Sequence, residues 1–453
     1  MSSNTHTVEE LLESVNQTIE ALETAQSTLV DGITRLTSHD VAATGSARGH
    51  VKLADAKDSA KTAAAGGWAL SPKALADFDT ANTNVIINTR DALRDDIEHA
   101  SGGRNTIVRD QWGNPHVMCV IPRFNLEDID PALGTGTHPA FIANGVVKSE
   151  ILIGKYQASK GSDNRVKTLP GKAPWVSINF DNALANCKAL GSGFTLVSNA
   201  AWAARALWLY KELGSSHEYM GNTNWGRSHT NKWETGVMQT VAYTPGDTGN
   251  NVSGATLTGT GPDSWNDDGT PWGISDLVGN VWEWCGGLRI VDGEIQVLVN
   301  NDAMLANANM ASNSGSWKAI LQDGSLVAPG TANTLKYDGK QADTKSGWSN
   351  AGACRINTTL VNQNVNGYWG QNFNAIEAAS GVTIPGILKA LGIAPVGTTG
   401  IQGWHNSCNK GERLPLRGGA WKSGSSAGPF FLVLNSGRTI AYWDLGFRPA
   451  FLP

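Results

Sequence analysis

The sequence is poor in charge and in long apolar runs. Charged residues make up 17% of the 453 positions, below the roughly 25% of ordinary globular proteins. The 35 basic and 40 acidic side chains give a net charge of −5. The basic residues form no stripe of the kind that binds nucleic acid, so we expect no such partner. No run of about 18 apolar residues occurs, so we expect no membrane insertion.

Paired cysteines are also lacking. The five cysteines are widely spaced, at Cys119, Cys187, Cys285, Cys354 and Cys408. Without a CxxC pair, zinc and thioredoxin-like sites lack their usual residues, and an odd count argues against a disulfide framework. We expect mostly buried free thiols. Residues 1–10 lack the basic segment and apolar run of a signal peptide, which predicts synthesis in a cytoplasm.

Glycine, tryptophan and short polar residues are abundant instead. The chain has 52 Gly and 17 Trp, with many Asn, Ser and Thr. This composition favours a loop-rich fold. It also suits an adhesive surface, because flat aromatic rings and short polar groups contact ligands at little entropic cost. The alternative is that most tryptophans are core residues.

Residues 1–40 carry a heptad pattern. Core positions alternate at spacings of four and three, at Val8, Leu12, Val15, Ile19, Leu22, Gln26, Leu29, Ile33 and Leu36. Such a pattern predicts a coiled coil, with Gln26 as a polar core position that fixes register. An isolated helix of this length is marginal, so self-association is the natural way to bury the stripe. The alternative is one amphipathic helix packed on the rest of the chain.

Residues 41–100 change character. The stretch 45–56 contains Gly-His-Val-Lys-Leu-Ala-Asp, and 62–75 ends in Ala-Leu-Ser-Pro-Lys-Ala-Leu. Together they resemble a short module of phage tail fibres. The resemblance implies a linker that attaches the chain to the phage tail or baseplate.

Residues 101–453 have a globular texture. Strand-like runs occur at 117–121 and 150–156, and helical patterns at 180–190 and 198–213. Residues 286–410 have few periodic segments apart from a helix predicted at 384–391, and they read as a long insertion.

Three motifs carry a family resemblance. They are Trp-Gly-Ile-Ser-Asp-Leu-Val-Gly-Asn-Val-Trp-Glu-Trp at 272–284, Leu-Arg-Gly-Gly-Ala-Trp at 416–421 and Leu-Gly-Phe-Arg-Pro-Ala at 445–450. In this order they resemble the signature of the formylglycine-generating and sulfatase-modifying family. The resemblance implies an α+β, C-type-lectin-like domain, here preceded by the N-terminal α-helical coiled coil.

The motif residues make physical sense as structure. Trp282 and Trp284 should share one strand face, with Glu283 on the other as a buried, hydrogen-bonded strut. Arg417 and Arg448 should hold carboxylates or carbonyls in bidentate fashion. The full structural set is Asn280, Trp282, Glu283, Trp284, Arg417, Gly418, Trp421, Gly446, Phe447 and Arg448.

The resemblance does not extend to the enzymes' chemistry. In those enzymes two cysteines follow the Arg-Gly-Gly motif and perform oxygen-dependent thiol chemistry. Here Ser423 and Gly428 stand at about those places. Serine has neither the low pKa nor the copper affinity of a thiolate. We therefore assign no catalytic residue and expect no enzyme activity of this type, with a sulfatase-modifying enzyme as the alternative.

Residues 417–448 resemble a second branch of the fold. The variable proteins of diversity-generating retroelements, including phage tropism determinants, end in such a segment and diversify it chiefly at asparagine codons. The resemblance implies a receptor-binding face made of Ser423, Ser426, Phe431, Val433, Ser436, Ile440, Tyr442, Trp443 and Asp444. The mixture of apolar, aromatic, acidic and hydroxyl side chains favours exposure. The alternative for Val433 and Ile440 is an ordinary core strand.

Other candidate sites are weak. Ser426 lies in a GxSxG pattern, but Pro429 and a strand-like run follow it instead of a helix. Asp263, Asp267 and Asp268 are the candidates for a structural calcium, which proteins of this fold often bind. We expect no other cofactor.

These observations predict a phage tail fibre protein that recognises a bacterial surface molecule, protein or glycan. Residues 1–40 would form a homotrimer, 41–100 would contact tail or baseplate proteins, and 101–453 would form the receptor-binding head. The predicted location is the virion, after synthesis in the host cytoplasm. A non-phage bacterial display protein is a further alternative.

Overall fold

A computed structural model describes residues 52–54, 68–70, 91–214, 217–239, 254–397 and 399–453. The chain divides into two units, residues 1–90 and 91–453. The coiled coil predicted for residues 1–40 lies outside the described residues, as does most of the predicted linker. In the first unit, β1 (Lys52–Ala54) pairs in parallel with β2 (Trp68–Leu70).

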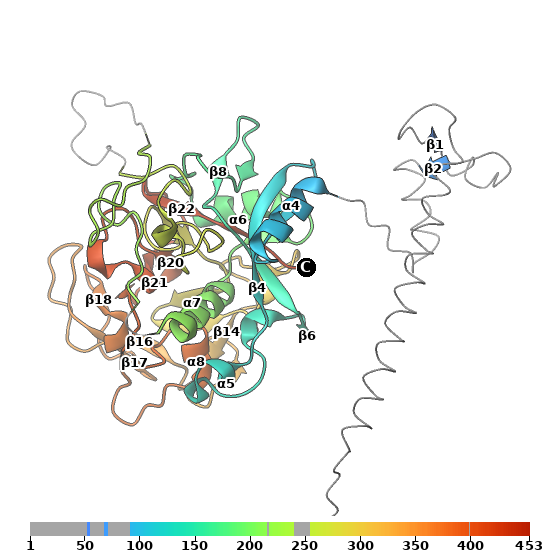
Figure 1. The fold of residues 1–453 in the computed structure, drawn as a ribbon. Coiled ribbons are helices and arrows are strands. Elements are labelled where there is room, and N and C mark those ends of the chain that lie inside the picture. Colours follow the sequence, from blue (N-terminus) through green and yellow to red (C-terminus); the bar gives the residue numbers. More distant parts are fainter. Residues whose placement is uncertain (1–51, 55–67, 71–90, 215–216, 240–253, 398) are drawn as a thin grey trace, which may run out of the picture. The chain divides into compact units, whose positions relative to one another are not determined.

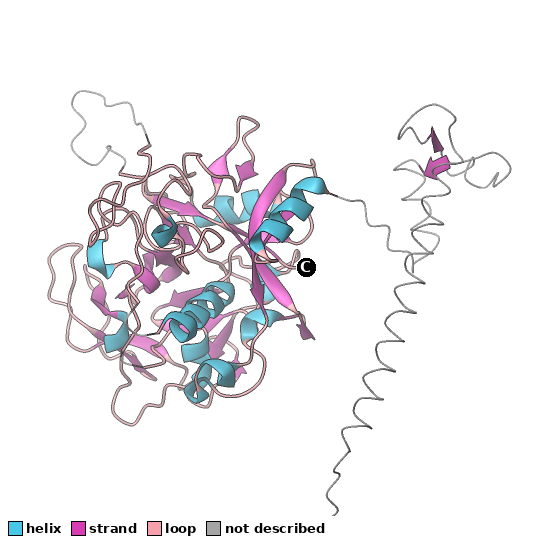
Figure 2. Cartoon of the chain, viewed as in Figure 1, coloured by secondary structure: helices cyan, strands magenta, loops and turns pink. Residues whose placement is uncertain are grey.

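The second unit mixes helices with many short strands, joined by extensive loops (Figures 1 and 2). Its helices are α4 (Ala92–Ser101), α5 (Leu126–Ile129), α6 (Phe180–Lys188), α7 (Asn199–Leu213) and α8 (Gly386–Ala390). Its strands are β3 (Asn105–Arg109), β4 (Pro115–Pro122), β5 (Ile142–Ala143), β6 (Val146–Val147), β7 (Glu150–Gly154), β8 (Ser159–Lys160), β9 (Val166–Lys167), β10 (Phe194–Leu196), β11 (Trp282–Trp284), β12 (Leu288–Val291), β13 (Glu294–Val297), β14 (Lys318–Ile320), β15 (Leu326–Val327), β16 (Lys336–Gly339), β17 (Cys354–Asn357), β18 (Trp369–Asn372), β19 (Trp404–Ser407), β20 (Glu412–Gly418), β21 (Gly428–Ser436), β22 (Leu445–Phe447) and β23 (Pro449–Phe451). This α+β composition agrees with the predicted fold class.

One antiparallel sheet has the order β10-β23-β7-β4-β3. The last strand of the chain therefore lies between β10 and β7, which come more than 200 residues earlier. Arg448, just before β23, lies beside the end of β7, where it donates to the Gly154 carbonyl at 2.8 Å. No helix among the described residues is long and apolar enough to cross a membrane.

A second, larger sheet follows the path β15-β14-β13-β12-β20-β21-β19-β18, with β11, β16, β17 and β22 joined at its sides. Strands β12 to β19 all belong to the predicted insertion 286–410. They are two to four residues long, too short to show a period in the sequence. Through β19 and β12, this segment adds strands on both sides of β20 and β21.

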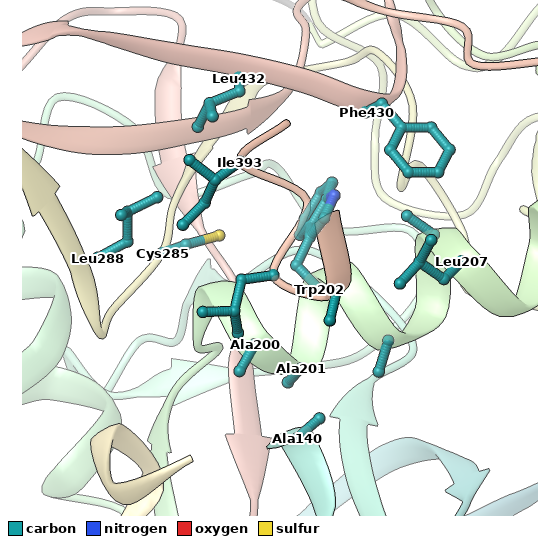
Figure 3. Packing of buried hydrophobic residues seen from close by; sticks show 14 of the residues in the cluster. Ala140, Ala200, Ala201, Trp202, Leu207, Cys285, Leu288, Ile393, Phe430 and Leu432 are labelled. Carbon is teal, nitrogen blue, oxygen red and sulfur yellow. The ribbon is translucent and has the colours of Figure 1, made fainter. Parts of the chain in front are cut away.

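Helix α7 packs at the centre of the main core. The Ser198 side chain accepts a hydrogen bond from the Ala201 N–H and so caps the helix, and Gly214 ends it with a positive φ of 72°. Small alanines let the helix approach its neighbours closely, and Trp202 fills the space toward β21 (Figure 3). The Trp202 indole donates to the Pro429 carbonyl at 2.7 Å. The helices predicted at 180–190, 198–213 and 384–391 are confirmed as α6, α7 and a shorter α8.

Candidate functional site

The three sequence motifs meet at β11. This strand pairs antiparallel with β20, placing Glu283 beside Arg417, and parallel with β22, placing Glu283 beside Gly446. Residues far apart in the sequence therefore form one local structure. Trp282 and Trp284 pack into the same hydrophobic cluster, as predicted from their alternation. The Trp284 indole donates to the Ile178 carbonyl at 3.0 Å.

Glu283 and Arg448 form a buried ion pair on the other face of β11. Arg448 donates from Nε and Nη2 to the two carboxylate oxygens at 3.0 and 2.7 Å. Its remaining hydrogen bonds go to the carbonyls of Gly154, Lys155 and Ser275. Both side chains are at most 1% exposed. The prediction of a structural strut is confirmed, and nothing in this arrangement leaves the carboxyl free to act as an acid.

Arg417 is a second buried strut. Its guanidinium donates from Nε and Nη2 to the Asn199 amide oxygen at 3.1 and 2.5 Å, and to the Gly392 carbonyl at 2.9 Å. It therefore joins β20 to the start of α7 and to the insertion. Burial lowers the pKa of Arg417 to about 10. Both acceptors are carbonyl oxygens, one of the two kinds of partner predicted for this arginine.

Asn280, Gly418 and Gly446 shape the backbone around these struts. Asn280 has a left-handed φ of 59°, and its side-chain oxygen accepts from the Thr256 N–H at 2.9 Å. A Cβ at Gly418 would lie 2.5 Å from the Leu277 carbonyl oxygen, and one at Gly446 would lie 2.9 Å from that of Trp175. Glycine is required at both places because the backbones approach so closely. The ring of Phe447 contacts that of Trp175 edge-on at 5.7 Å.

The places of the enzymes' two cysteines do not fit thiol chemistry. The Ser423 hydroxyl accepts a hydrogen bond from the Ala420 N–H at 2.9 Å. At Gly428 a Cβ would lie 2.2 Å from the Gln402 carbonyl oxygen, so no side chain fits without backbone movement. A copper-binding thiolate pair therefore has no room here, and we derive no chemistry through copper.

The cysteines that the chain does have are buried and unpaired, as predicted. Burial raises the pKa of the Cys119 thiol to about 11 and that of Cys354 to about 12. It also raises the pKa of Cys187 and Cys285. These four thiols stay protonated at neutral pH, which suppresses their nucleophilicity.

Four of the nine predicted receptor-binding residues are buried: Phe431, Val433, Ser436 and Asp444. The expectation that these four residues are exposed is wrong, and the alternative of an ordinary core strand is confirmed for Val433. Strand β21 lies between β19 and β20. All five side chains of the run Phe-Phe-Leu-Val-Leu at 430–434 are buried, so both faces of the strand are covered. A continuous apolar run of this length is typical of a strand buried on both faces.

The other predicted residues reach the surface to different degrees. Tyr442 is 49% exposed, while Ser423, Ser426, Ile440 and Trp443 are intermediate. Ile440 packs at the edge of the cluster that contains Phe431. Ser426 ends a 3-10 turn that leads into β21, so the GxSxG pattern has no helix after its serine.

Two further residues, Lys422 and Ser425, are exposed beside them. Lys422 contacts Asp444 at 2.8 Å and its ammonium lies 4.6 Å from the centre of the Trp443 ring. Trp443 in turn packs on the buried ring of Trp421 at 4.9 Å. We call Lys422, Ser423, Ser425, Ser426, Tyr442 and Trp443 the C-terminal face.

A neighbouring loop, residues 219–239, was missed from the sequence. The Trp225 N–H donates to the Trp421 carbonyl at 2.8 Å, and the Gly424 N–H donates to the Thr223 carbonyl at 2.9 Å. Trp225 and Trp233 are 45% and 86% exposed. The Asn-Trp-Gly turn at 224–226 was the available signal, but nothing in the sequence tied it to a segment 200 residues later.

Two of the three candidate calcium ligands, Asp267 and Asp268, have protein partners. Asp267 accepts from Arg205 Nε and Nη2 at 2.6 and 2.7 Å, and Asp268 accepts from the Thr270 N–H at 2.9 Å. No group of three or more His, Cys, Asp or Glu side chains suited to a metal occurs among the described residues. A structural calcium stays a prediction that these contacts do not favour.

Comparison with known proteins bears on the motif region. Residues 101–312 match the sulfatase-modifying factor enzyme 1-like domain family. The match ends before the Arg417 and Gly446 motifs, but β11 pairs with the strands that carry both. A search of curated proteins finds no match.

Two solved structures are distant likenesses. Treponema denticola variable protein 1 is 14% identical, with 77% of this chain and 99% of that chain covered and a TM-score of 0.30. PvdO from Pseudomonas aeruginosa is 12% identical, with 77% and 98% covered and a TM-score of 0.30. Likenesses this distant say nothing about what this chain binds. The family match and the motifs agree in one respect: residues 101–312, which are similar to the sulfatase-modifying factor enzyme 1-like domain family, include the motif at 272–284.

Proposed function

We propose that this chain is a receptor-binding protein of a phage tail fibre, which grips a bacterial surface molecule through the C-terminal face without covalent chemistry. The observation that carries the proposal is the replacement of the enzymes' two cysteines at one place in the fold. Where the related enzymes carry two cysteines, this chain has Ser423 and a Gly428 with no room for a side chain. Beside them it displays Lys422, Tyr442 and Trp443.

The scaffold beneath this face is buried and hydrogen-bonded, which suits recognition. Trp421 is fully buried under Trp443, and its N–H donates to the Asn280 carbonyl at 3.0 Å. The face is thereby attached to the motif core. A rigid scaffold leaves little conformational entropy to lose on binding. Exchange of the exposed side chains, as in the variable proteins that residues 417–448 resemble, would then change the target without changing the fold.

The N-terminal part supplies the assembly in this proposal. The heptads of residues 1–40 would form a homotrimer, and residues 41–100 would attach it to tail or baseplate proteins of the virion. Three faces acting together turn weak single-site binding into firm attachment through effective concentration. Light scattering on the full chain should give a mass of about three times 47.9 kDa. A monomer would contradict the trimeric fibre.

The enzyme alternative draws support from the name of the matched family. The residues of this chain oppose it, because four of its thiols are buried with raised pKa values. Incubation with copper and a cysteine-containing sulfatase peptide should yield no formylglycine. Formation of that product would reinstate the enzyme.

Binding to bacteria tests the proposal directly. The fluorescently labelled full chain is titrated onto a panel of intact bacterial strains, and Tyr442→Ala is compared with wild type on any strain that is bound. A central aromatic anchor typically loses about tenfold or more in affinity on truncation. Trp112→Ala is a matched control, since Trp112 is 43% exposed and packs on Arg165 in another hairpin. Equal binding by Tyr442→Ala and wild type would place the binding surface elsewhere.

A further inference from the structure

We propose that the loop of residues 219–239 adds a fixed aromatic anchor, Trp225, to the C-terminal face, and that the completed face fits a surface of a partner protein. This inference rests on the function proposed above. It adds a binding residue outside the segment 417–448 and names the class of partner.

The loop is built onto the face. The hydrogen bonds Trp225 N–H to Trp421 carbonyl and Gly424 N–H to Thr223 carbonyl, at 2.8 and 2.9 Å, join it to the turn that carries the exposed serines. A Cβ added to Gly254 would lie 2.2 Å from Cδ1 of Trp421 and 2.8 Å from Cε3 of Trp225. A single glycine therefore lies between the indoles of Trp225 and Trp421, and the buried Trp421 ring contacts that of Trp443 at 4.9 Å.

The motif core fixes the turn at Trp225. Asn222 is fully buried, and its side-chain oxygen accepts from the Gly226 N–H at 2.7 Å. Its side-chain nitrogen donates to the Gly254 carbonyl at 2.8 Å and to the Asn280 side-chain oxygen at 3.2 Å. The same asparagine that shapes the family motif thus helps to hold the loop. Trp225 is presented by a preorganised backbone.

Trp225 is strained and exposed at once. Its φ is 55°, a left-handed conformation that bulky residues rarely adopt. A core tryptophan could offset that strain by full burial, yet Trp225 is 45% exposed. Strain retained at an exposed aromatic residue points to a role in binding, since such outliers cluster at functional sites.

The chemistry of the completed face fits a protein. Exposed Trp225, Tyr442 and, at the tip of the same loop, Trp233 supply large flat contacts. Lys422 is matched with Asp444 at 2.8 Å and His229 with Glu218 at 2.9 Å, and the loop also exposes Arg227 and Lys232. Interface centres are rich in tryptophan, tyrosine and arginine, and short hydroxyls adapt to varied protein surfaces.

A selection experiment tests both parts of the proposal. Residues 423, 426 and 442 are randomised together in the displayed full chain, and binders are selected on purified lysozyme and, separately, on mannan. Trp225→Ala, Trp225→Gly and the control Trp112→Ala are then introduced into the selected binders. Dissociation constants and thermal unfolding midpoints are measured for each.

We expect binders to lysozyme whose Kd rises at least tenfold with Trp225→Ala or Trp225→Gly and less than twofold with Trp112→Ala. Trp225→Gly should unfold at a higher temperature than Trp225→Ala, because glycine accepts the left-handed conformation. Lysozyme binders unaffected by both Trp225 variants would overturn the anchor and leave the proposed function standing. Binders to mannan alone would overturn the protein partner. Failure to obtain any binder would contradict the proposed function itself.

Discussion

Residues 417–448 contain two sets of side chains that differ in burial. Arg417 and Arg448 are fully buried struts whose hydrogen bonds are satisfied by the protein. Between them in sequence, Lys422 and Tyr442 are exposed. The comparison shows that residues of one motif-bearing segment divide between scaffold and surface, and that the division follows strand position. Side chains on β21 are buried except for the half-buried Asn435, whereas Lys422 before the strand and Tyr442 after it are exposed.

The largest effect should come from breaking the scaffold. Arg448→Met leaves Glu283 buried without its partner, which costs about 3–5 kcal/mol of unfolding free energy. Urea unfolding of the purified variant measures this. A variant as stable as wild type would show that the ion pair contributes nothing to the scaffold.

Phe431→Ala sharpens the comparison within the predicted binding set. Phe431 is 4% exposed and packs edge-on against Trp282 at 4.6 Å, so truncation leaves a cavity that costs about 3–5 kcal/mol. The unfolding midpoint in urea should fall accordingly. If stability is unchanged while ligand binding is lost, Phe431 belongs to the face after all.

Acid should weaken the scaffold through its buried histidines. Burial lowers the pKa of His138 to about 4 and that of His405 to about 3. The unfolded chain therefore takes up protons first as pH falls below about 6.5, and at pH 5 each histidine has lost about 2 kcal/mol of its contribution. Asp276, whose pKa burial raises to about 6, opposes this by about 1 kcal/mol because its folded form is protonated first.

Thermal unfolding at pH 7.5 and pH 5 checks this expectation. His405→Leu should show a smaller drop between the two pH values than wild type. Neither ring nitrogen of His405 has a hydrogen-bond partner among the described residues, so the variant removes no hydrogen bond that the structure describes. An identical fall in the unfolding midpoint of both proteins would show that His405 does not contribute to the acid sensitivity.

The smallest stability effect belongs to the face. Tyr442→Ala should change the unfolding free energy by no more than about 0.5 kcal/mol, as is usual for exposed positions. Chemical denaturation measures it beside Phe431→Ala. A loss of several kcal/mol would make Tyr442 a core residue and erase the distinction between the two sets.

The sequence predicted the scaffold better than the face. The motif spacing and strand alternation were enough to predict a buried Glu283 with both tryptophans on the opposite side, because these are local and periodic signals. The exposure of Phe431 and Val433 was mispredicted. Their neighbours on β19 come from the insertion, and a sequence does not show which strands will cover a given face.

The tryptophans also divide into a buried set and an exposed set. Trp202, Trp265, Trp284, Trp317, Trp369 and Trp421 are fully buried, while Trp112, Trp225, Trp233 and Trp348 are exposed. Both expectations for this residue type therefore hold, each for a different subset. Composition alone could not assign members to either set, because burial depends on contacts between distant segments, such as Trp421 with Trp225 and Gly254.

The most direct test of the central claim combines two readouts on one protein, the variant with Lys422→Ala, Tyr442→Ala and Trp443→Ala together. Binding to a bacterial strain that wild type recognises and the unfolding midpoint are measured side by side. The account predicts that binding is lost while the midpoint falls by far less than in Arg448→Met. Retained binding in a folded triple variant would contradict the claim that this chain recognises its target through the C-terminal face.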